Sequence, residues 1–156
     1  METTKEIRTK KTEDGLIVVI RIAGMVKVKK DIAETLNKLR LRRKYSCVII
    51  NKNKSVLGML QKVKYYVAYG YINKETLMKL IKERAESIEG RKKEIKIDEK
   101  KVAEGLFNGK KLQEFKLKPF FRLHPPRKGI KSKLQYPKGV LGDNKEDINK
   151  LIERML

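Results

Sequence analysis

The side chains of this sequence that could do chemistry are mainly cationic, and they gather in two segments. The 156 residues include 40 Lys and Arg against 19 Asp and Glu, which gives a formal net charge of +21. Residues 16–72 contain thirteen basic and two acidic side chains, and residues 116–139 contain eight basic side chains and no acidic one. Positive charge of this density repels itself in a free chain and is neutralised by a polyanion. The pattern predicts contact with the phosphates of nucleic acid.

The second segment, residues 116–139, is predicted to be an extended cationic arm. It holds all four prolines of the chain. Because proline fixes φ and removes a hydrogen-bond donor, the arm cannot be one long helix. Phe120 and Phe121 are adjacent within it, and adjacent side chains of an extended segment point in opposite directions. One ring is therefore expected to anchor the arm in the core and the other to be available for contact.

Catalysis finds little support in these residues. His124 is the only histidine and the only candidate general acid or base, and no carboxylate occurs within the arm. An active site needs a nucleophile, a base and an orienting group close together, so the sequence predicts a non-catalytic protein without a cofactor. Two roles stay open for His124. Its ring could be hydrogen-bonded in a proline-flanked turn, or it could stack on a base or bond a phosphate.

Three other motifs that can carry chemistry are better interpreted as structure. Cys47 is the single cysteine and lies in an apolar run, so we expect a buried free thiol and no cysteine-based metal site. Residues 105–111 have three residues between their glycines, whereas a phosphate-binding P-loop needs four and a hydroxyl. Residues 139–142 match the G-x-x-G loop of KH domains, but their apolar centre favours an inward-facing turn.

The first basic segment is predicted to form the core that positions these cations. Runs of β-branched residues predict strands over residues 16–24 and 45–51, and an aromatic run predicts a third over residues 65–72. Apolar residues at helical spacing predict a helix over residues 28–41, and a second helix is predicted to follow Ser55 as its N-cap. The order β-α-β-α-β predicts an α+β fold in which a three-stranded sheet carries both helices on one face.

Two kinds of residue in this core have alternative interpretations. Arg21 interrupts the first strand, so that end of the strand is expected to meet solvent or a partner. Four tyrosines of the third strand could form a platform on which bases stack, or they could pack in the core, which is the simpler interpretation. They are Tyr65, Tyr66, Tyr69 and Tyr71.

The N-terminal segment, residues 1–15, is polar and balanced in charge, which predicts a flexible tail. It has no apolar stretch typical of a secretory signal. No apolar run of the chain approaches the ~18 residues that span a bilayer. We therefore expect a protein of the reducing cytosol that is not a membrane protein.

The second half of the chain is predicted to add helices. Residues 73–115 mix both charges, which indicates a helical module with N-caps at Asn73 and Asp98, and residues 94–97 alternate like a short edge strand. Residues 116–156 comprise the arm and a terminal helix, with Asn144 and Asp147 as a capping-box-like pair at the start of that helix. The apolar stripe of that helix is expected to dock on the core and to fix the far end of the arm.

Long stretches of the sequence resemble the large-subunit ribosomal protein thirty family in its archaeal and eukaryotic long form. They are LIVVIRIAGMVKVKKDIAETLNKLRLRRKYSCVIINKN, SVLGMLQKVKYYVAYGYIN, and the tail FKLKPFFRLHPPRKGIKSK followed by GVLGDNKEDINKLIERML. The resemblance implies a core with likeness to a ferredoxin-like fold, to which residues 73–156 are the archaeal-type extension. It implies a cytoplasmic, non-catalytic constituent of the large ribosomal subunit. Its partners would be 23S-type rRNA, close to the 5S rRNA, and neighbouring ribosomal proteins, with no small-molecule substrate.

The residues predicted to contact RNA are basic side chains of the core and the arm, together with the histidine. They are Arg21, Lys27, Lys29, Lys30, Arg40, Arg42, Arg43, Lys44, Lys52, Lys62, Lys64, Arg122, His124, Arg127, Lys128, Lys131 and Lys133. The alternatives are an RNA-binding regulator or RNA chaperone outside the ribosome, a nucleic-acid enzyme that uses His124, and a protein of anionic membrane surfaces.

Overall fold

The computed structural model describes residues 16–88, 98–130, 132–136 and 138–156. The first strands and helices are β1 (Leu16–Arg21), α2 (Lys30–Lys38), β2 (Ser46–Asn51), α3 (Lys54–Val63) and β3 (Val67–Tyr71). Then follow α4 (Lys74–Arg84), α5 (Glu99–Phe107), η1 (Leu112–Phe115), β4 (Phe121–Arg122), β5 (Gly142–Asp143), η2 (Lys145–Asp147) and α6 (Ile148–Met155). The predicted tail at residues 1–15 and the predicted strand at residues 94–97 lie outside the described residues.

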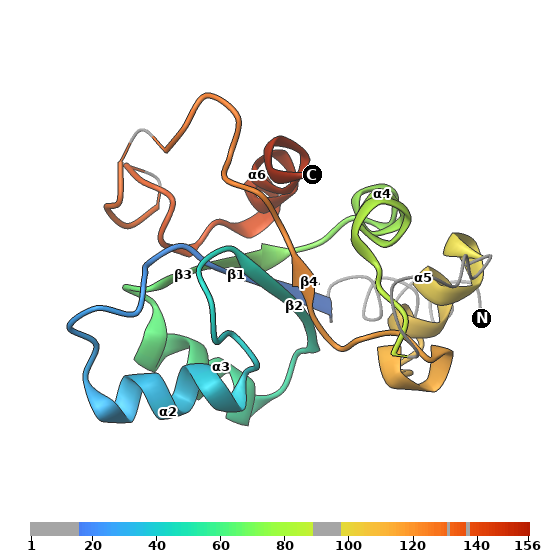
Figure 1. Ribbon diagram of the computed structural model, residues 1–156, viewed down its shortest axis with the longest axis horizontal. Coiled ribbons are helices and arrows are strands. Elements are labelled where there is room, and N and C mark those ends of the chain that lie inside the picture. Colours follow the sequence, from blue (N-terminus) through green and yellow to red (C-terminus); the bar gives the residue numbers. More distant parts are fainter. Residues whose placement is uncertain (1–15, 89–97, 131, 137) are drawn as a thin grey trace, which may run out of the picture.

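The sheet has five strands in the order β4-β2-β1-β3-β5, with β1 antiparallel to both β2 and β3 (Figure 1). The predicted β-α-β-α-β order is confirmed for its three central strands. The predicted strand number is wrong, because two short strands from the arm and the segment after it extend the sheet at both edges. β4 pairs with Ser46 and Cys47, and β5 pairs in parallel with Ala68 and Tyr69.

All six residues of β1 are buried, and its two faces contact different helices. Ile17 and Val19 pack in a cluster with side chains of α2 and α3. Leu16, Val18 and Ile20 belong to a second cluster with side chains of α4, α5 and α6. The prediction that the first two helices share one face is confirmed, and Figure 1 shows α4 and α6 on the other face. The residues from 73 onward therefore complete the core that the first strands begin.

Two of the predicted helix starts need correction. Asn53, not Ser55, caps α3, since its side chain accepts a hydrogen bond from the Val56 N–H at 2.7 Å. Asn144 and Asp147 do not form a capping box. The Asn144 amide donates to the Val140 and Gly142 carbonyl oxygens instead, and residues 145–147 form the short helix η2. In both places an asparagine side chain satisfies the nearest unpaired backbone groups of its turn.

The cap predicted at the start of α5 is confirmed. The Asp98 carboxylate accepts from the Lys101 N–H at 3.4 Å. Asn73 stands at the N-cap position of α4, but its side chain forms no cap hydrogen bond. Its backbone N–H is bound instead by Asn149 of α6.

The arm is fixed near its start by β2 and in its middle by α6. At its start β4 pairs with β2, and the Leu123 N–H donates to the Tyr45 carbonyl at 3.1 Å. Further along, the His124 and Arg127 N–H groups donate to the carbonyl oxygens of Met155 and Arg154 in α6. The apolar stripe of α6 is buried on the sheet, so the helix holds the middle of the arm and leads the chain back from β5.

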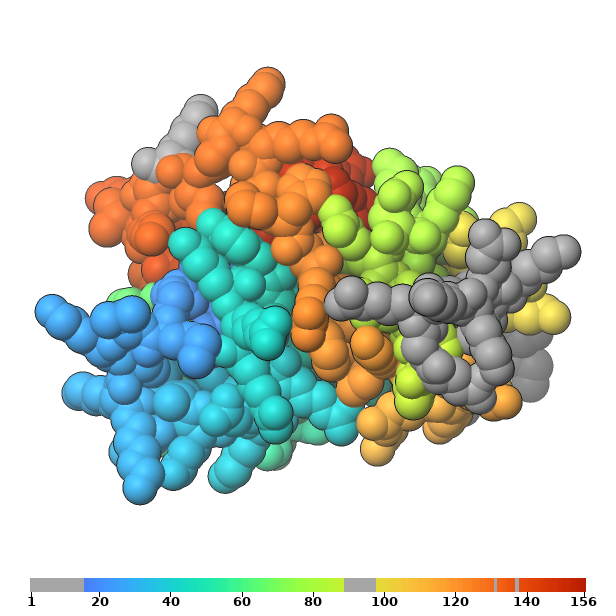
Figure 2. Space-filling view, in the orientation of Figure 1, coloured from blue at the N-terminus to red at the C-terminus, as the bar shows by residue number. Residues whose placement is uncertain are grey.

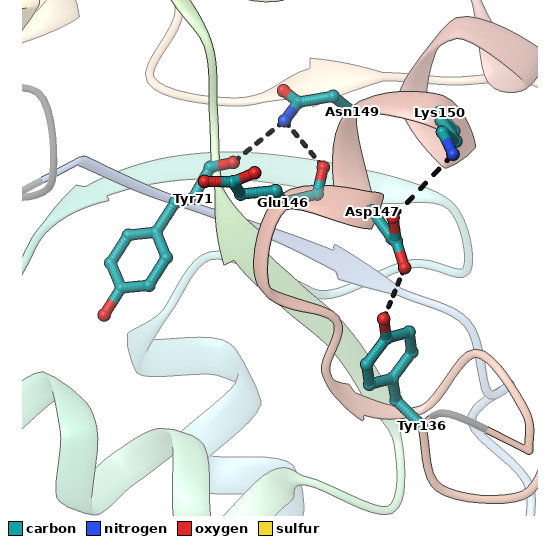
Figure 3. A network of polar contacts seen from close by, with 6 residues as sticks. All are labelled: Tyr71, Tyr136, Glu146, Asp147, Asn149 and Lys150. Carbon is teal, nitrogen blue, oxygen red and sulfur yellow. Dashed lines mark hydrogen bonds and ion pairs between the residues drawn. The ribbon is translucent and has the colours of Figure 1, made fainter.

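Asn149 joins α6 to the connection between β3 and α4 (Figure 3). Its side-chain amide donates to the Tyr71 and Glu146 carbonyl oxygens, and its carbonyl accepts from the Asn73 N–H at 2.9 Å. Next to it, the Tyr136 hydroxyl donates to the Asp147 carboxylate. This hydrogen bond raises the pKa of Tyr136. The pair links the arm to the segment that starts α6.

Replacing Asn149 by leucine should lower the free energy of unfolding by about 2–3 kcal/mol. The substitution keeps a similar side-chain volume but leaves the Asn73 N–H and the Tyr71 carbonyl without their partner. Urea unfolding followed by circular dichroism measures the change. Asn37→Leu is the matched control, because Asn37 is exposed on α2, and it should change stability by no more than about 0.5 kcal/mol. Equal effects of the two substitutions would contradict the structural role of Asn149.

Candidate nucleic-acid interface

The segments that contain most of the predicted RNA-contact residues lie at one end of the sheet. The register pairs Arg21 with Val67 and Ser46 with Arg122, and Ala68 with Gly142. The end of β1 therefore lies beside the beginnings of β2, β3 and β5 and beside the end of β4. The loops that meet there are residues 22–29, 39–45 and 64–66, together with the arm.

Four arginines surround a hollow of about 400 Å³ at this end. Its lining residues, which we call the arginine hollow, are Arg40, Arg42, Arg43, Ser46, Pro119, Phe120 and Arg122. All four arginines are exposed. Figure 2 shows the cyan core residues and the orange arm residues side by side on one face of the molecule. The hollow is thus built jointly by the two basic segments of the sequence.

None of the four arginines of the hollow is ion-paired within the part of the chain that the structure describes. The ion pairs found there join residues of the second half, such as Lys74 with Glu104 and Lys79 with Glu153. Guanidinium groups bind carboxylates or phosphates through parallel N–H donors. The four guanidinium groups of the hollow therefore have no carboxylate partner among the described residues.

The turn before β2 holds its arginines in place through the end of α2. The Arg40 N–H donates to the Asn37 carbonyl, and the Leu41 N–H donates to the Leu36 carbonyl. Arg40 itself has φ of 63°. This is the Schellman arrangement, which usually has glycine at the left-handed position. Leu41 packs in the same buried cluster as Leu36, which supports the strained residue.

Arginine at a left-handed position costs about 1 kcal/mol relative to a relaxed conformation. We therefore expect Arg40→Gly to raise the free energy of unfolding by about 0.5–1 kcal/mol. The same substitution removes one cation from the hollow, so RNA affinity should fall while stability rises. Thermal unfolding and RNA titration of the same sample measure both effects. A less stable Arg40→Gly protein would contradict the assignment of strain to this residue.

Arg21 is the predicted contact residue that the structure assigns to a different role. Its side chain is only 3% exposed, and burial lowers the pKa of its guanidinium. It donates to the carbonyl oxygens of Leu41, Ala23 and Gly24. The expectation that this end of β1 meets solvent is wrong at Arg21. Its guanidinium instead ties the loop after β1 to the turn before β2, because both present carbonyl oxygens towards it.

The loop between β1 and α2 extends the basic surface. Lys27, Lys29 and Lys30 are exposed, and Lys27 has φ of 57°. Met25 and Val26 at its tip are 66% and 85% exposed. Arg21 holds the start of this loop through the Ala23 and Gly24 carbonyl oxygens. The loop and the first residue of α2 therefore present three exposed lysines and two exposed apolar side chains.

The arm contributes exposed cations along its length. The Arg122 guanidinium lies 5.7 Å from the centre of the Phe120 ring, a cation–π arrangement. The His124 imidazole faces the carbonyl oxygens of Pro125 and Leu156, which favours its structural role. Arg127, Lys128 and Lys133 are exposed. Lys131 lies outside the described residues.

Comparison with known proteins adds a decisive observation. A family model described as ribosomal protein L30p/L7e matches residues 17–67. A protein of Archaeoglobus fulgidus, named large ribosomal subunit protein uL30, is 45% identical over 153 residues, which cover 90% of this chain and 99% of the relative. The chain belongs to the ribosomal protein L30p/L7e family. The resemblance noted in the sequence is confirmed.

Two further relatives also match most of the L30p/L7e-type chain. Proteins with the same name from Methanococcus vannielii and Nanoarchaeum equitans are 40% and 38% identical, over 151 and 155 residues. They cover 88% and 91% of this chain and 97% and 99% of their own lengths. The family model spans β1 to the beginning of β3, whereas these archaeal relatives also match residues of the second half.

Not every predicted contact residue of this L30p/L7e family member lies at the same end of the sheet. Lys62 at the end of α3 is exposed, and the Lys64 carbonyl accepts from the Gln135 side chain of the arm at 3.2 Å. Both lie near the arginine end. Lys44, also exposed, lies beside the hollow with its ammonium 5.1 Å from the centre of the Tyr45 ring. Lys52 follows β2 at the opposite end, where it donates to the Tyr71 hydroxyl at 3.1 Å.

Some residues that line the candidate interface, or that hold it in place, could not be identified from the distribution of basic residues in the sequence. Ser46 and Phe120 line the arginine hollow. Arg154 of α6 donates to the Arg127 and Gly129 carbonyl oxygens and so fixes the turn of the arm. The one usable signal was the adjacent pair of phenylalanines. Phe121 is buried, as predicted for the anchoring ring, and Phe120 is half-buried beside Arg122 and against the cluster of α2 and α3.

The tyrosines divide between the two interpretations. Tyr69 is buried, and burial raises its pKa, with Asp143 and Tyr71 adding to the shift. Tyr66 and Tyr71 are partly buried against the cluster of α2 and α3. Tyr65 is 61% exposed and has the Lys64 ammonium 5.3 Å from the centre of its ring. Core packing therefore describes most of them, and Tyr65 is the exception.

The described residues of this family member were also compared with what a cysteine site, a metal site and a membrane-spanning helix require. Cys47 is a buried free thiol, as predicted, and burial raises its pKa. Within the described ranges, no group of three or more His, Cys, Asp or Glu side chains could hold a metal ion. No helix in those ranges is both long enough and apolar enough to cross a membrane.

Proposed function

We propose that this chain is a non-catalytic, structural protein of the large ribosomal subunit in the cytoplasm and that it binds 23S-type rRNA. The curated relatives are named for the large ribosomal subunit, which supports the assembly. Its neighbours there would be other ribosomal proteins and, as the sequence resemblance implies, the 5S rRNA. The RNA would lie across the arginine end of the sheet and along the arm.

The observation that supports RNA contact most directly is the arginine hollow. It joins three arginines of the core turn to Arg122 of the arm, without an acidic lining residue in the described part of the chain. RNA offers phosphates for the guanidinium groups and bases for stacking on exposed rings. Phe120, with Arg122 over its face, would suit an unstacked base. Lys27, Lys29 and Lys30 would contact phosphates farther along the same surface.

Titration of the whole protein against large-subunit rRNA at increasing salt tests this proposal. Each phosphate that the protein neutralises steepens the log–log dependence of affinity on salt by about 0.7 for a single strand. We expect a slope of roughly −4 to −7 for six to ten contacts. A slope near zero would contradict phosphate binding.

Sedimentation with large subunits distinguishes a ribosomal constituent from an RNA-binding regulator. We expect the protein to stay with purified large subunits after a high-salt wash. Loss of the protein from the subunits, with retained binding to free RNA, would contradict the structural role. Stronger binding to anionic liposomes than to rRNA would contradict both.

A further inference from the structure

The outer edge of β2 is only half paired. Cys47 pairs with Phe121 of β4, and the Tyr45 carbonyl accepts from the Leu123 N–H. Odd-numbered residues of β2 therefore direct their backbone groups towards β4, because these directions alternate along a strand. Ile49 and Asn51 direct their N–H and carbonyl groups the same way, but no described residue pairs with them.

Pro119 explains why the arm leaves this edge. Continuing the register of β4 would place Pro119 opposite Ile49, and proline has no N–H to donate to the ladder. The preceding residues pair elsewhere: Leu117 forms a bridge with Ser87, and the Lys118 N–H donates to the Glu86 carbonyl at 2.8 Å. Because of Pro119, the arm does not pair with the part of the β2 edge that follows Cys47.

A groove of about 420 Å³ runs along this open edge, between β2 and the segment of α5 and η1. We call it the edge groove. Its apolar lining includes Val48, Met59 and Leu112. Lys38, Arg40, Lys110 and Lys111 provide its cations, and no acidic residue is among its described lining. The groove thus combines backbone donors and acceptors, an apolar floor and positive charge.

We propose that the edge groove binds an extended peptide segment of a partner protein, one with alternating apolar and acidic residues. The peptide would add a strand to β2, with its backbone bonded to Ile49 and Asn51. Alternate side chains would then face the apolar floor and the cations. RNA suits the groove less well, because it offers no strand to pair with the backbone and no apolar side chains for the floor. This site is separate from the rRNA contact of the arginine hollow except for Arg40 and Pro119 at their border.

Titration of the ¹⁵N-labelled full chain with a short acetylated peptide of alternating glutamate and valine tests the proposal. We expect saturable shifts and slower hydrogen exchange at the Ile49 and Asn51 amides. A peptide with proline in place of each valine has the same charge but lacks those backbone donors. It should leave both amides unchanged, which separates strand addition from simple charge attraction. Equal shifts with both peptides, or no saturation with the first, would overturn the proposal.

Charge reversal at the groove provides the matched variants. Lys110→Glu with Lys111→Glu should weaken peptide binding about tenfold, whereas Lys82→Glu with Lys100→Glu, at exposed positions outside the groove, should not. Binding of large-subunit rRNA is measured on the same proteins. It should be affected alike in both pairs, so failure of peptide binding and failure of the proposed rRNA contact remain distinguishable. Shifts of Ile49 and Asn51 by a single-stranded RNA oligonucleotide, without such shifts by the peptide, would assign the groove to RNA and overturn the proposal.

Discussion

Replacing Arg42, Arg43 and Arg122 by glutamine should weaken binding to large-subunit rRNA about 100-fold at near-physiological salt. The three side chains come from two distant segments but line one hollow. None has an internal ion pair in the described residues, so their removal leaves no buried charge behind. The expected loss of stability is within about 0.5 kcal/mol. The effect on affinity should therefore appear in a fully folded protein.

The salt dependence of binding identifies the physical origin of this loss. If the three arginines contact phosphates, the slope of log affinity against log salt should become shallower by about 2. A control with the same change in net charge is Lys82→Gln, Lys100→Gln and Lys101→Gln, on the exposed surfaces of α4 and α5. It should retain most of the affinity. If both triple variants lost affinity equally, only the overall charge of the protein would matter and the hollow would not be a specific contact site.

The spacing of apolar residues predicted the central strands and helices, because the burial of those residues determines how these elements pack. Residues 16–20 form a continuous apolar run that is buried on both faces, which is the pattern of a central strand. The helical stripe that includes Leu36 and Leu39 gave α2 and the face on which it packs. The stripe of α6 likewise predicted docking, since an exposed stripe of that width would be unstable in water.

Details that depend on backbone pairing lay beyond the sequence. β4 and β5 are two residues long, too short to leave a pattern of alternating residues. Arg21 has the same charge as the surface arginines, but it lies where carbonyl oxygens of two loops converge. Its burial follows from the geometry of the turn at Leu41, and amino-acid composition does not predict that geometry. Arg40 is exposed, as expected, but its left-handed backbone conformation at the end of α2 has no signal in the sequence.

Replacing Phe121 by alanine should have the largest effect on stability, a loss of about 3–5 kcal/mol. Phe121 is 1% exposed and packs in the cluster that joins the sheet to α4, α5 and α6. It also lies opposite Cys47 in the two-residue ladder that holds the arm on β2. Removing the ring leaves a cavity and weakens that ladder. Chemical unfolding measures the change, which is a large share of the 5–15 kcal/mol typical of a domain.

The neighbouring Phe120→Ala supplies the control, because Phe120 directly precedes β4 and its ring packs against a different cluster from that of Phe121. Phe120 is only half-buried, between the cluster of α2 and α3 and the arginine hollow beside Arg122, so its removal should reduce stability by only about 1 kcal/mol. Its effect should appear instead in rRNA affinity, since a base-stacking ring contributes about 1–3 kcal/mol to binding. The pair should therefore dissociate the two roles of the arm: Phe121 determines whether the arm stays on the sheet, and Phe120 determines what the arm binds. A stability loss at Phe120 as large as that at Phe121 would assign both rings to the core and remove Phe120 from the interface.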